Sequence, residues 1–277
     1  EMRVSLVRSN PREVVLDVEV LGISYEYVNT KGGRFTRFSG GTGVTGNIGK
    51  PELPIITKLI EIPQDAVVKI ELQDVEAEEH SLSELGVLHP VYPVQAPIPK
   101  IPGATENAKF EMDRIAYLSD RFFPDKVCTY GDIAEIRGTR VIPLDIAPVQ
   151  YNPAKNTIRV TKKMRIRLIL SGSDMSYTRW KKERYFSPYF DEMLRKEIVN
   201  YESTKYHPQI PVGYLIITHD DFYDNILPLA EWKEKKGFYV TVTKKSEILG
   251  GGSATNIGNY IEDAYDNWDI PPTFCLL

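Results

Sequence analysis

The stretch GYLIITHDDFYDNILPLAEWKEKKGFYVTVT (213–243) decides the fold class of the C-terminal part of the chain. Its first six residues, GYLIIT (213–218), form a short continuous apolar run, which is typical of a parallel strand covered on both faces. A helical stretch over about 221–236 follows and ends at Gly237, and FYVTVT (238–243) predicts a second strand. Strand, helix and strand in this order predict the beginning of a doubly wound parallel sheet.

The same pattern continues to the last residue. Apolar side chains recur at helical spacing between residues 257 and 268, and TFCLL (273–277) predicts a third strand. A parallel sheet of three strands leaves unprotected edges. We therefore expect residues 212–277 to be only the first half of an α/β domain, with more chain after Leu277.

Residues 1–173 show a different pattern, with apolar and polar residues alternating. This period of two is typical of half-buried antiparallel strands. The alternating apolar residues are Leu16, Val18 and Val20; Ile23, Tyr25 and Tyr27; Val68, Ile70 and Leu72; Ile158 and Val160; and Met164, Ile166 and Leu168. The segment YNPAKNT (151–157) lies between two such runs and predicts a hairpin connection. Many short strands without intervening helices predict an antiparallel β-sandwich.

A proline-rich stretch over residues 89–124 interrupts these strands. HPVYPVQAPIPKIPG (89–103) contains five prolines, so it can form neither a central strand nor a helix. We expect extended, polyproline-like backbone that lies over another surface.

Residues 174–211 predict a linker that contains one helix. Ser187 and Pro188 are a good N-cap and first helical residue, and KYHPQIP (205–211) predicts an extended end. The basic segment TRWKKER (178–184) should be solvated, and such a linker is a good target for proteolytic processing. The basic candidates for processing are Arg179, Lys181, Lys182 and Arg184.

Composition excludes several classes of protein. The 277 residues contain 34 Lys and Arg against 38 Asp and Glu, a net charge of −4 that argues against a nucleic-acid partner. No apolar run approaches the roughly 20 residues that span a bilayer. The N-terminal EMRVSLVRSN lacks the apolar stretch of a signal peptide, so we expect either a cytosolic protein or an exported one whose signal has been removed. Cys128 and Cys275 are too few and too far apart for a disulfide framework.

Two glycine-rich segments resemble phosphate-binding loops only in part. Gly41, Gly43 and Gly46 have dinucleotide-binding spacing, but the prolines of the following NIGKPELP forbid the helix that such a site needs. LGGGSAT (249–255) lies between a strand and a helix, but it lacks the lysine of a P-loop. Both segments therefore predict loops without a nucleotide.

The four histidines do not define a catalytic or metal site. His219 ends the first parallel strand, where ligands bind in such sheets, although THDDF equally predicts a helix-capping turn. A pair of His219 with Cys275 is disfavoured because Cys275 lies inside an apolar strand, where a thiol is usually inert. His80, His89 and His207 are scattered without metal-ligand spacing.

Several longer phrases resemble the gingipain-like cysteine peptidases. In the N-terminal part these are KPELPIITKLIEIPQDAVVKIEL (50–72) and IRGTRVIPLDIAPVQYNPAKNTIRVTKKMRIRLIL (136–170), which resemble the family's pro-domain. The segment 213–248 and the segment IGNYIEDAYDNWDIPPTFCLL (257–277) resemble the start of the family's catalytic domain. The resemblance covers nearly the whole chain, with the phrases in the family's order.

This resemblance implies a secreted zymogen. A β-sandwich pro-domain (1–173) would precede the first half of a caspase-like α/β peptidase domain (212–277), which uses a His–Cys pair. In the family, the catalytic His follows the third strand of the sheet and the Cys follows the next strand, so the resemblance places both after Leu277 and assigns no residue here. Family catalytic domains often bind calcium, but no ligand set is recognisable in this chain. The implied partners are the protein's own catalytic segment and the protein substrates of the mature enzyme.

The family's pro-domains present a basic side chain to the specificity pocket. By resemblance, Lys100 in IPKIPG is the first candidate and Arg114 the second. Rigid extended backbone loses little entropy on docking, which suits an inhibitory segment. A solvent-exposed loop lysine stays open as the alternative.

Two further functions stay open. One is a non-catalytic extracellular binding or filament-forming module whose β-sandwich is the functional part. The other is a sortase-like transpeptidase on the same scaffold.

Overall fold

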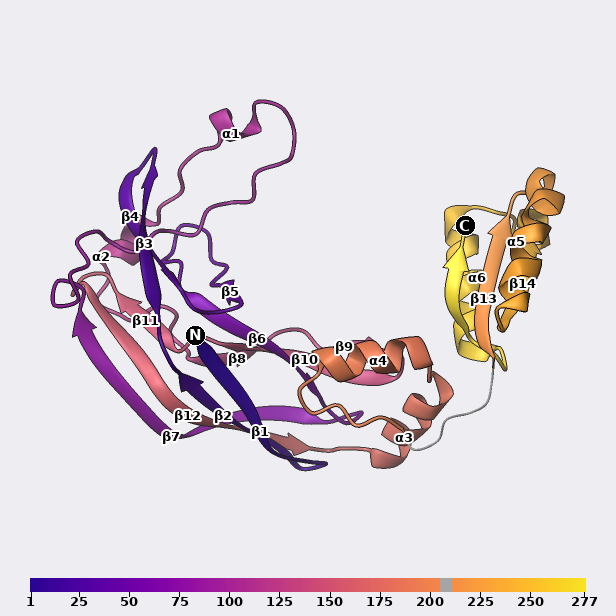
Figure 1. Ribbon diagram of the computed structural model, residues 1–277, viewed down its shortest axis with the longest axis horizontal. Helices are drawn as coiled ribbons and strands as arrows, with labels where there is room; N and C mark the ends of the chain where they lie inside the picture. Colours follow the sequence, from indigo (N-terminus) through magenta and orange to yellow (C-terminus); the bar gives the residue numbers. More distant parts are fainter. Residues whose placement is uncertain (205–210) are drawn as a thin grey trace. The chain divides into compact units, whose positions relative to one another are not determined.

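The computed structural model describes residues 1–204 and 211–277, which form two compact units (Figure 1). The β unit consists of Glu1–Thr178 and Leu194–Glu202. The α/β unit consists of Arg179–Met193 and Ser203–Leu277. The predicted linker is therefore divided between the two units. Its predicted extended end, KYHPQIP, lies outside the described residues except for its last proline, and so does His207.

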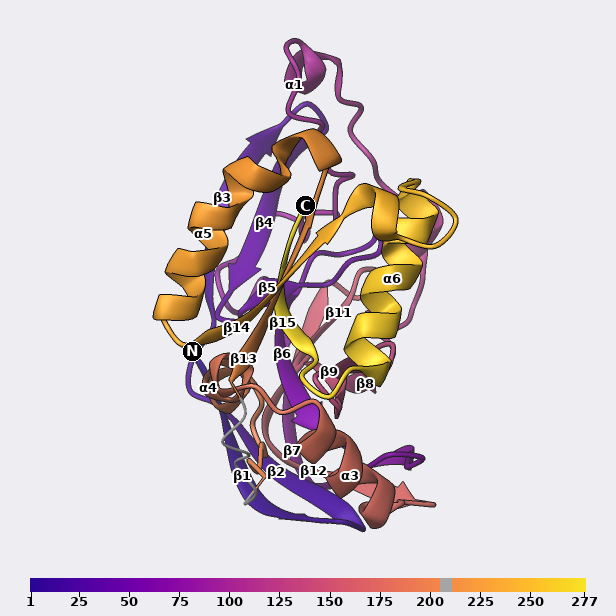
Figure 2. The same cartoon turned by 90° about the vertical axis from the view of Figure 1, so that its right-hand side faces the viewer.

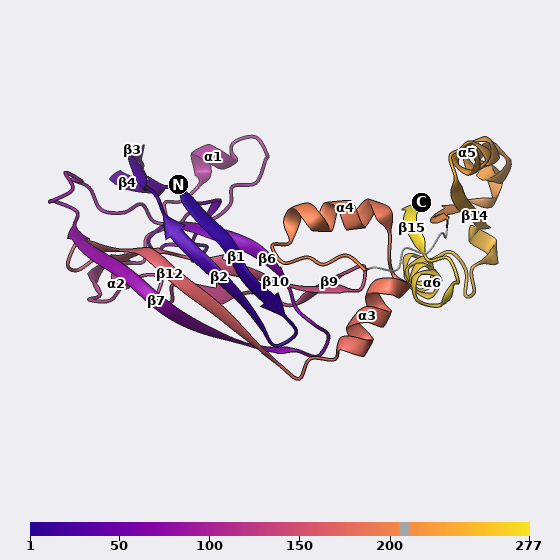
Figure 3. The same ribbon diagram turned by 60° about the horizontal axis from the view of Figure 1, so that its bottom comes forward.

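Two five-stranded antiparallel sheets build the β unit. In the first sheet, the strand order is β1-β2-β12-β11, and β7 also pairs with β12. Figure 3 shows β1, β2, β12 and β7 side by side. In the second, the order is β5-β6-β10-β8, and β9 also pairs with β10. The bounds of the first sheet are β1 Met2–Asn10, β2 Glu13–Val20, β7 Val67–Ser81, β11 Val149–Asn152 and β12 Thr157–Ser171. Those of the second are β5 Gly43–Val44, β6 Pro54–Glu61, β8 Cys128–Tyr130, β9 Ala134–Ile136 and β10 Thr139–Ile146.

The two sheets share one hydrophobic core. Leu16 of β2 and Ile166 of β12 contribute from the first sheet, and Ile60 of β6 and Leu144 of β10 from the second; all four are fully buried. They lie at the alternating apolar positions because successive side chains of a strand point to opposite faces. The predicted antiparallel β-sandwich is confirmed, and β11 and β12 form the predicted hairpin around residues 153–156.

The proline-rich stretch begins as extended backbone beside a separate hairpin, β3 (Ser24–Thr30) and β4 (Gly33–Ser39). The amide of Thr36 donates to the carbonyl of Pro90 (2.8 Å), and the amide of Tyr92 donates back to Thr36 (2.7 Å). Extended backbone lying over another surface is thus confirmed. Two short helices follow that the sequence did not predict, α1 (Ala104–Asn107) and α2 (Arg114–Leu118).

The α/β unit contains a parallel sheet with the strand order β14-β13-β15. Helices α5 and α6 flank the sheet on opposite sides (Figure 2). The strands are β13 Val212–Thr218, β14 Phe238–Lys244 and β15 Pro272–Leu276, and the helices are α5 Tyr223–Lys235 and α6 Ala254–Asn267, with 3-10 turns at Asp220–Phe222 and Lys245–Glu247. The predicted strand–helix order is confirmed, and α5 continues across Pro228.

Residues 174–202 contain two helices where the sequence predicted one. Helix α4 (Pro188–Glu197) begins as predicted, but α3 (Met175–Arg184) occupies the segment predicted to be a solvated linker. Asp174 begins α3, because its carboxylate accepts from the amide of Tyr177 (2.8 Å). The basic residues that suggested a linker are also good helix formers. The basic charge of this segment therefore did not distinguish a solvated linker from a helix.

Candidate functional site

The segment 96–110 projects from the β unit as a loop whose two ends are fastened together. The side-chain amide of Gln95 donates to the carbonyl of Glu111 (2.8 Å), and its oxygen accepts from the amide of Glu111 (2.9 Å). The same amide group donates to the carbonyl of Pro93 (2.8 Å). Figure 1 shows this segment, with α1 near its end, extending away from the two sheets. We call residues 96–110 the clamped loop.

The base of the clamped loop is packed against the β3–β4 hairpin. The ring of Phe110 lies 5.3 Å from the ring of Phe35, centroid to centroid, and covers Gly32 so closely that a Cβ there would lie 2.2 Å from it. Lys31 of the hairpin turn donates to the carbonyls of Glu106 (2.6 Å) and Ala108 (3.2 Å). These contacts hold the returning arm of the loop.

Lys100 lies in the exposed part of the clamped loop, in a tight turn. The amide of Ile101 donates to the carbonyl of Pro99 (2.9 Å), which makes Lys100 the central residue of a three-residue turn. Gly103, with a φ of 78°, then reverses the chain into α1. The flanking prolines and this turn restrict the backbone, so the lysine side chain is presented from a preorganised position.

Arg114 lies in a different local structure. It is the first residue of α2, three positions after the clamp residue Glu111, and it is exposed. Asp113 caps this helix by accepting from the amides of Ile115 and Ala116 (both 3.0 Å). Arg114 is therefore part of a regular helix outside the clamped loop, and the two candidates do not share one turn.

The basic candidates for processing all lie in α3 rather than in an extended linker. Arg179 is exposed, whereas Lys181, Lys182 and Arg184 are half-buried. Arg184 donates to backbone carbonyls at the end of α6. Peptidases bind extended substrates, so cleavage within α3 requires local unwinding.

His219 forms the capping turn that was one of its two predicted roles. Its Nδ1 accepts from the amide of Asp221 (3.2 Å) at the start of the 3-10 turn that precedes α5. Cys275 of β15 is paired with Leu215 of β13, and Leu215 lies four residues before His219. Cys275 and His219 are therefore separated by about 13 Å along the strand direction. The two residues therefore form no catalytic pair.

Neither thiol has the surroundings of a nucleophile. Burial raises the pKa of Cys128 to about 12, with a further contribution from the charge of Asp145. Cys275 was predicted to be buried, but it is exposed, since β15 is an edge strand in the described sheet. Partial burial nevertheless raises the pKa of its thiol. The thiolate is the nucleophilic form of cysteine, so the raised pKa values argue against an activated catalytic thiol at either position.

The remaining motifs have structural roles. A Cβ on Gly41 would lie 2.2 Å from the carbonyl oxygen of Ile55, so glycine is needed there for the close approach to β6. In LGGGSAT, Ser253 caps α6 by accepting from the amide of Asn256 (3.2 Å). Within residues 1–204 and 211–277, no group of three or more His, Cys, Asp or Glu could hold a metal ion.

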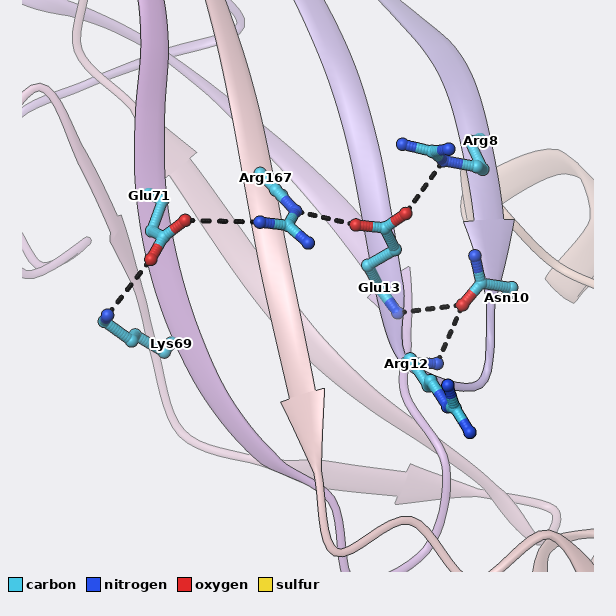
Figure 4. Close-up of polar contacts among 7 residues, drawn as sticks. All are labelled: Arg8, Asn10, Arg12, Glu13, Lys69, Glu71 and Arg167. Atoms are coloured by element: carbon cyan, nitrogen blue, oxygen red, sulfur yellow. Dashed lines mark hydrogen bonds and ion pairs between the residues drawn. The ribbon is translucent and has the colours of Figure 1, made fainter.

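A row of alternating charges crosses the outer face of the first sheet and was not predicted (Figure 4). Arg167 of β12 contacts Glu13 of β2 (2.6 Å) and Glu71 of β7 (3.5 Å). Arg8 of β1 and Lys69 of β7 extend the row at its two ends (2.9 and 3.0 Å). Such cross-strand pairs stabilise register, and they suggest no chemistry.

The fold defines a class of protein: an antiparallel β-sandwich followed by a parallel α/β sheet of three described strands. The family model Propeptide_C25 matches residues 2–207, and the model Peptidase family C25 matches residues 207–277. The chain belongs to the gingipain (C25) family, as its propeptide and the start of its catalytic domain. The resemblance found in the sequence is thereby confirmed.

Relatives of known name are gingipains of Porphyromonas gingivalis. The chain is 29% identical over 244 residues to Lys-gingipain HG66, which covers 87% of this chain and 14% of that protein. It is 22% identical over 238 residues to Gingipain R2, which covers 83% of this chain and 30% of that protein. The chain thus spans a small part of these relatives.

Two solved structures share the fold. One, from work on the zymogenic latency of gingipain K, aligns with a TM-score of 0.55 at 25% identity over 62% of this chain and 93% of that chain. The other, the complex of Porphyromonas gingivalis RgpB pro- and mature domains, aligns with a TM-score of 0.57 at 19% identity over 72% and 98%. In the described part of this chain, no helix is both long and apolar enough to cross a membrane.

The sequence did not reveal the residues that fasten the clamped loop. Gln95 and Glu111 are 16 positions apart, and neither stands in a recognisable motif. Phe110 is likewise a single aromatic residue in a polar stretch. Only the proline-rich stretch 89–103 and the family resemblance pointed to this segment.

Proposed function

We propose that this chain is the zymogen region of a secreted gingipain-like cysteine endopeptidase, in which the β unit inhibits the catalytic domain and assists its folding. The family match supports a propeptide, and the clamped loop with Lys100 in its exposed turn is the observation that carries the inhibitory role. The partner is the protein's own catalytic segment. Protein substrates are the partners of the mature enzyme.

Lys100 is the residue that would enter the specificity pocket. A loop that is ordered before docking loses little conformational entropy when it binds. The amide of the Lys100–Ile101 bond is held in a tight turn, whereas peptidases bind their substrates as extended strands, so the loop can occupy the pocket and resist hydrolysis. Relatives named Lys-gingipain support a preference of the cognate enzyme for lysine.

We propose that the catalytic His and Cys lie outside the 277 residues. His219 is engaged in a helix cap, and both cysteines have raised thiol pKa values, which supports this placement.

Inhibition of the mature cognate peptidase by the chain tests this function. Removing one member of a buried charged pair costs about 2–5 kcal/mol, so Lys100→Ala should raise the inhibition constant by about 100-fold. Lys109→Ala, an exposed lysine at the base of the same loop, is the matched control and should change it little. Arg114→Ala tests the second candidate.

An unchanged inhibition constant for Lys100→Ala would remove Lys100 from the inhibitory site. A raised inhibition constant for Arg114→Ala would assign the inhibitory side chain to Arg114 instead. A chain that inhibits nothing and assembles with itself would favour the non-catalytic module. Cleavage sites in the processed protein test the four basic residues of α3. The two family models meet at residue 207, which supports a junction between propeptide and peptidase after α3 rather than within it.

A further inference from the structure

Residues 179–193 belong to the propeptide by family match, yet they are part of the α/β unit in the structure. We call them the strap. The strap contains most of α3, the turn at Ser187 and the first half of α4. The side chains of Arg184, Tyr185 and Tyr189 contact the elements that the peptidase family model covers, and each contact has its own physical basis.

Arg184 caps the C-terminal end of α6. One guanidinium nitrogen donates to the carbonyls of Asp266 (3.0 Å) and Trp268 (2.6 Å). The last carbonyls of a helix have no partner within the helix and carry partial negative charge, so a cation is favoured there. Helix α6 has no basic residue of its own in its last turn. The strap therefore supplies the charge that this helix end lacks.

Tyr185 binds the same end of α6 through its ring and its hydroxyl. Its ring stacks on Tyr265 with 4.7 Å between centroids and 10° between planes. Its hydroxyl donates to the carboxylate of Asp266 (3.0 Å). Tyr185 is only 8% exposed, and its burial raises the pKa of the phenol, with the hydrogen bond to Asp266 adding to the rise. An apolar ring with a satisfied hydroxyl is the usual composition of an interface anchor.

Tyr189 contacts the aromatic face of the parallel sheet. Its ring meets Phe274 of β15 edge-on (5.2 Å) and stacks on Phe238 of β14 (6.2 Å). Tyr214 of β13 completes this face by contacting both phenylalanines. The strap thus contacts aromatic side chains from two of the three described strands of the peptidase sheet, β14 and β15, in addition to the end of α6.

We infer that the strap is a docking segment of the propeptide for the peptidase domain, separate from the clamped loop, and that it stays bound when the chain is cut between the two family regions. Its binding surface on the peptidase is the C-terminal end of α6 together with the aromatic face of the sheet. This inference rests on the proposed function only in treating residues 2–207 as a propeptide. It requires neither inhibition nor Lys100.

The test uses the full chain with residues 205–210 replaced by a recognition sequence for an exogenous endopeptidase. After cleavage, gel filtration at decreasing protein concentration measures the concentration below which the two fragments separate. The unmodified strap should keep them together. The double variant Arg184→Ala and Tyr185→Ala should raise the concentration at which they separate by at least about tenfold, because two charge-assisted hydrogen bonds and a stacked ring are lost. Arg179→Ala, in the same helix but exposed, should behave like the unmodified chain.

Circular dichroism before cleavage establishes that each variant is folded. If the double variant fails to fold, Tyr185→Phe replaces it, because this change removes only the hydrogen bond to Asp266. It should raise the concentration at which the fragments separate by about fivefold. The inference would be overturned if the fragments of the unmodified chain separated immediately after cleavage. It would also be overturned if the strap variants separated at the same concentration as Arg179→Ala. Lys100→Ala should leave separation unchanged, which distinguishes failure of the strap from failure of the proposed inhibition.

Discussion

Replacing Gln95 with alanine should open the clamped loop without unfolding the sandwich. The Gln95 side chain makes both hydrogen bonds that join it to Glu111, so its removal leaves the two ends of residues 96–110 without this connection. The core of the two sheets contains neither residue. The change therefore acts on the loop and leaves the packing of the β unit intact.

The size of the effect follows from these two bonds. A typical intramolecular hydrogen bond contributes about 1 kcal/mol net, because water replaces the lost partner. Losing both bonds of the clamp should favour the open loop by about 2 kcal/mol, which is roughly a 30-fold change in the opening equilibrium. Phe110 and Lys31 still hold the returning arm, so the loop should open rather than detach.

Limited proteolysis by trypsin at Lys100 measures this opening directly, since cleavage tracks the population of the open form. The rate should rise by about 30-fold in Gln95→Ala, and the inhibition constant should rise in parallel. In a Lys100→Ala background, Gln95→Ala should have little further effect on inhibition, because the clamp acts by presenting that lysine. Additive effects of the two changes, or an unchanged trypsin rate, would refute this account.

Three further predictions concern stability and thiol reactivity. The hydrogen bond from Arg167 holds the pKa of Glu13 below its usual 4.5, against a smaller rise from burial. The stabilisation from this pair is therefore present above about pH 4.5 and is lost as the pH falls through the folded-state pKa. The urea concentration at the unfolding midpoint should fall in acid, and it should fall less in the variant Glu13→Gln. Leu144→Ala should lower the free energy of unfolding of the β unit by about 2–5 kcal/mol in urea titrations, because it leaves a cavity between the sheets. A thiol reagent should modify the exposed Cys275 in the native chain and Cys128 only after unfolding.

Each of these predictions has a control within the chain. Glu19 lies on the same strand as Glu13, and Glu19→Gln should leave the pH dependence of the urea midpoint unchanged. Leu88→Ala removes a side chain of a residue that is 78% exposed and should change stability by less than about 0.5 kcal/mol. Rapid modification of both thiols in the native chain would contradict the burial of Cys128.

The elements of both units could be predicted because their hydrophobic patterns are local. Alternation at Leu16 and Val18, or at Ile166 and Leu168, specifies a strand with one buried face regardless of its partner. The continuous apolar run 213–218 likewise specifies a covered parallel strand. Helix α3 was missed because basic residues suit both a solvated linker and a helix, and Asp174 marks its start only through the capping geometry.

The sequence by itself determined the fold class, the family, and the position of Lys100 in a proline-rich segment. Tertiary structure alone decided that Gln95 fastens this segment and that Arg184 and Tyr185 dock on α6. The physical reason is the range of the interactions. Periodicity and proline act on neighbouring residues, whereas these hydrogen bonds and ring contacts join residues 16 to more than 80 positions apart, whose meeting depends on the folded chain.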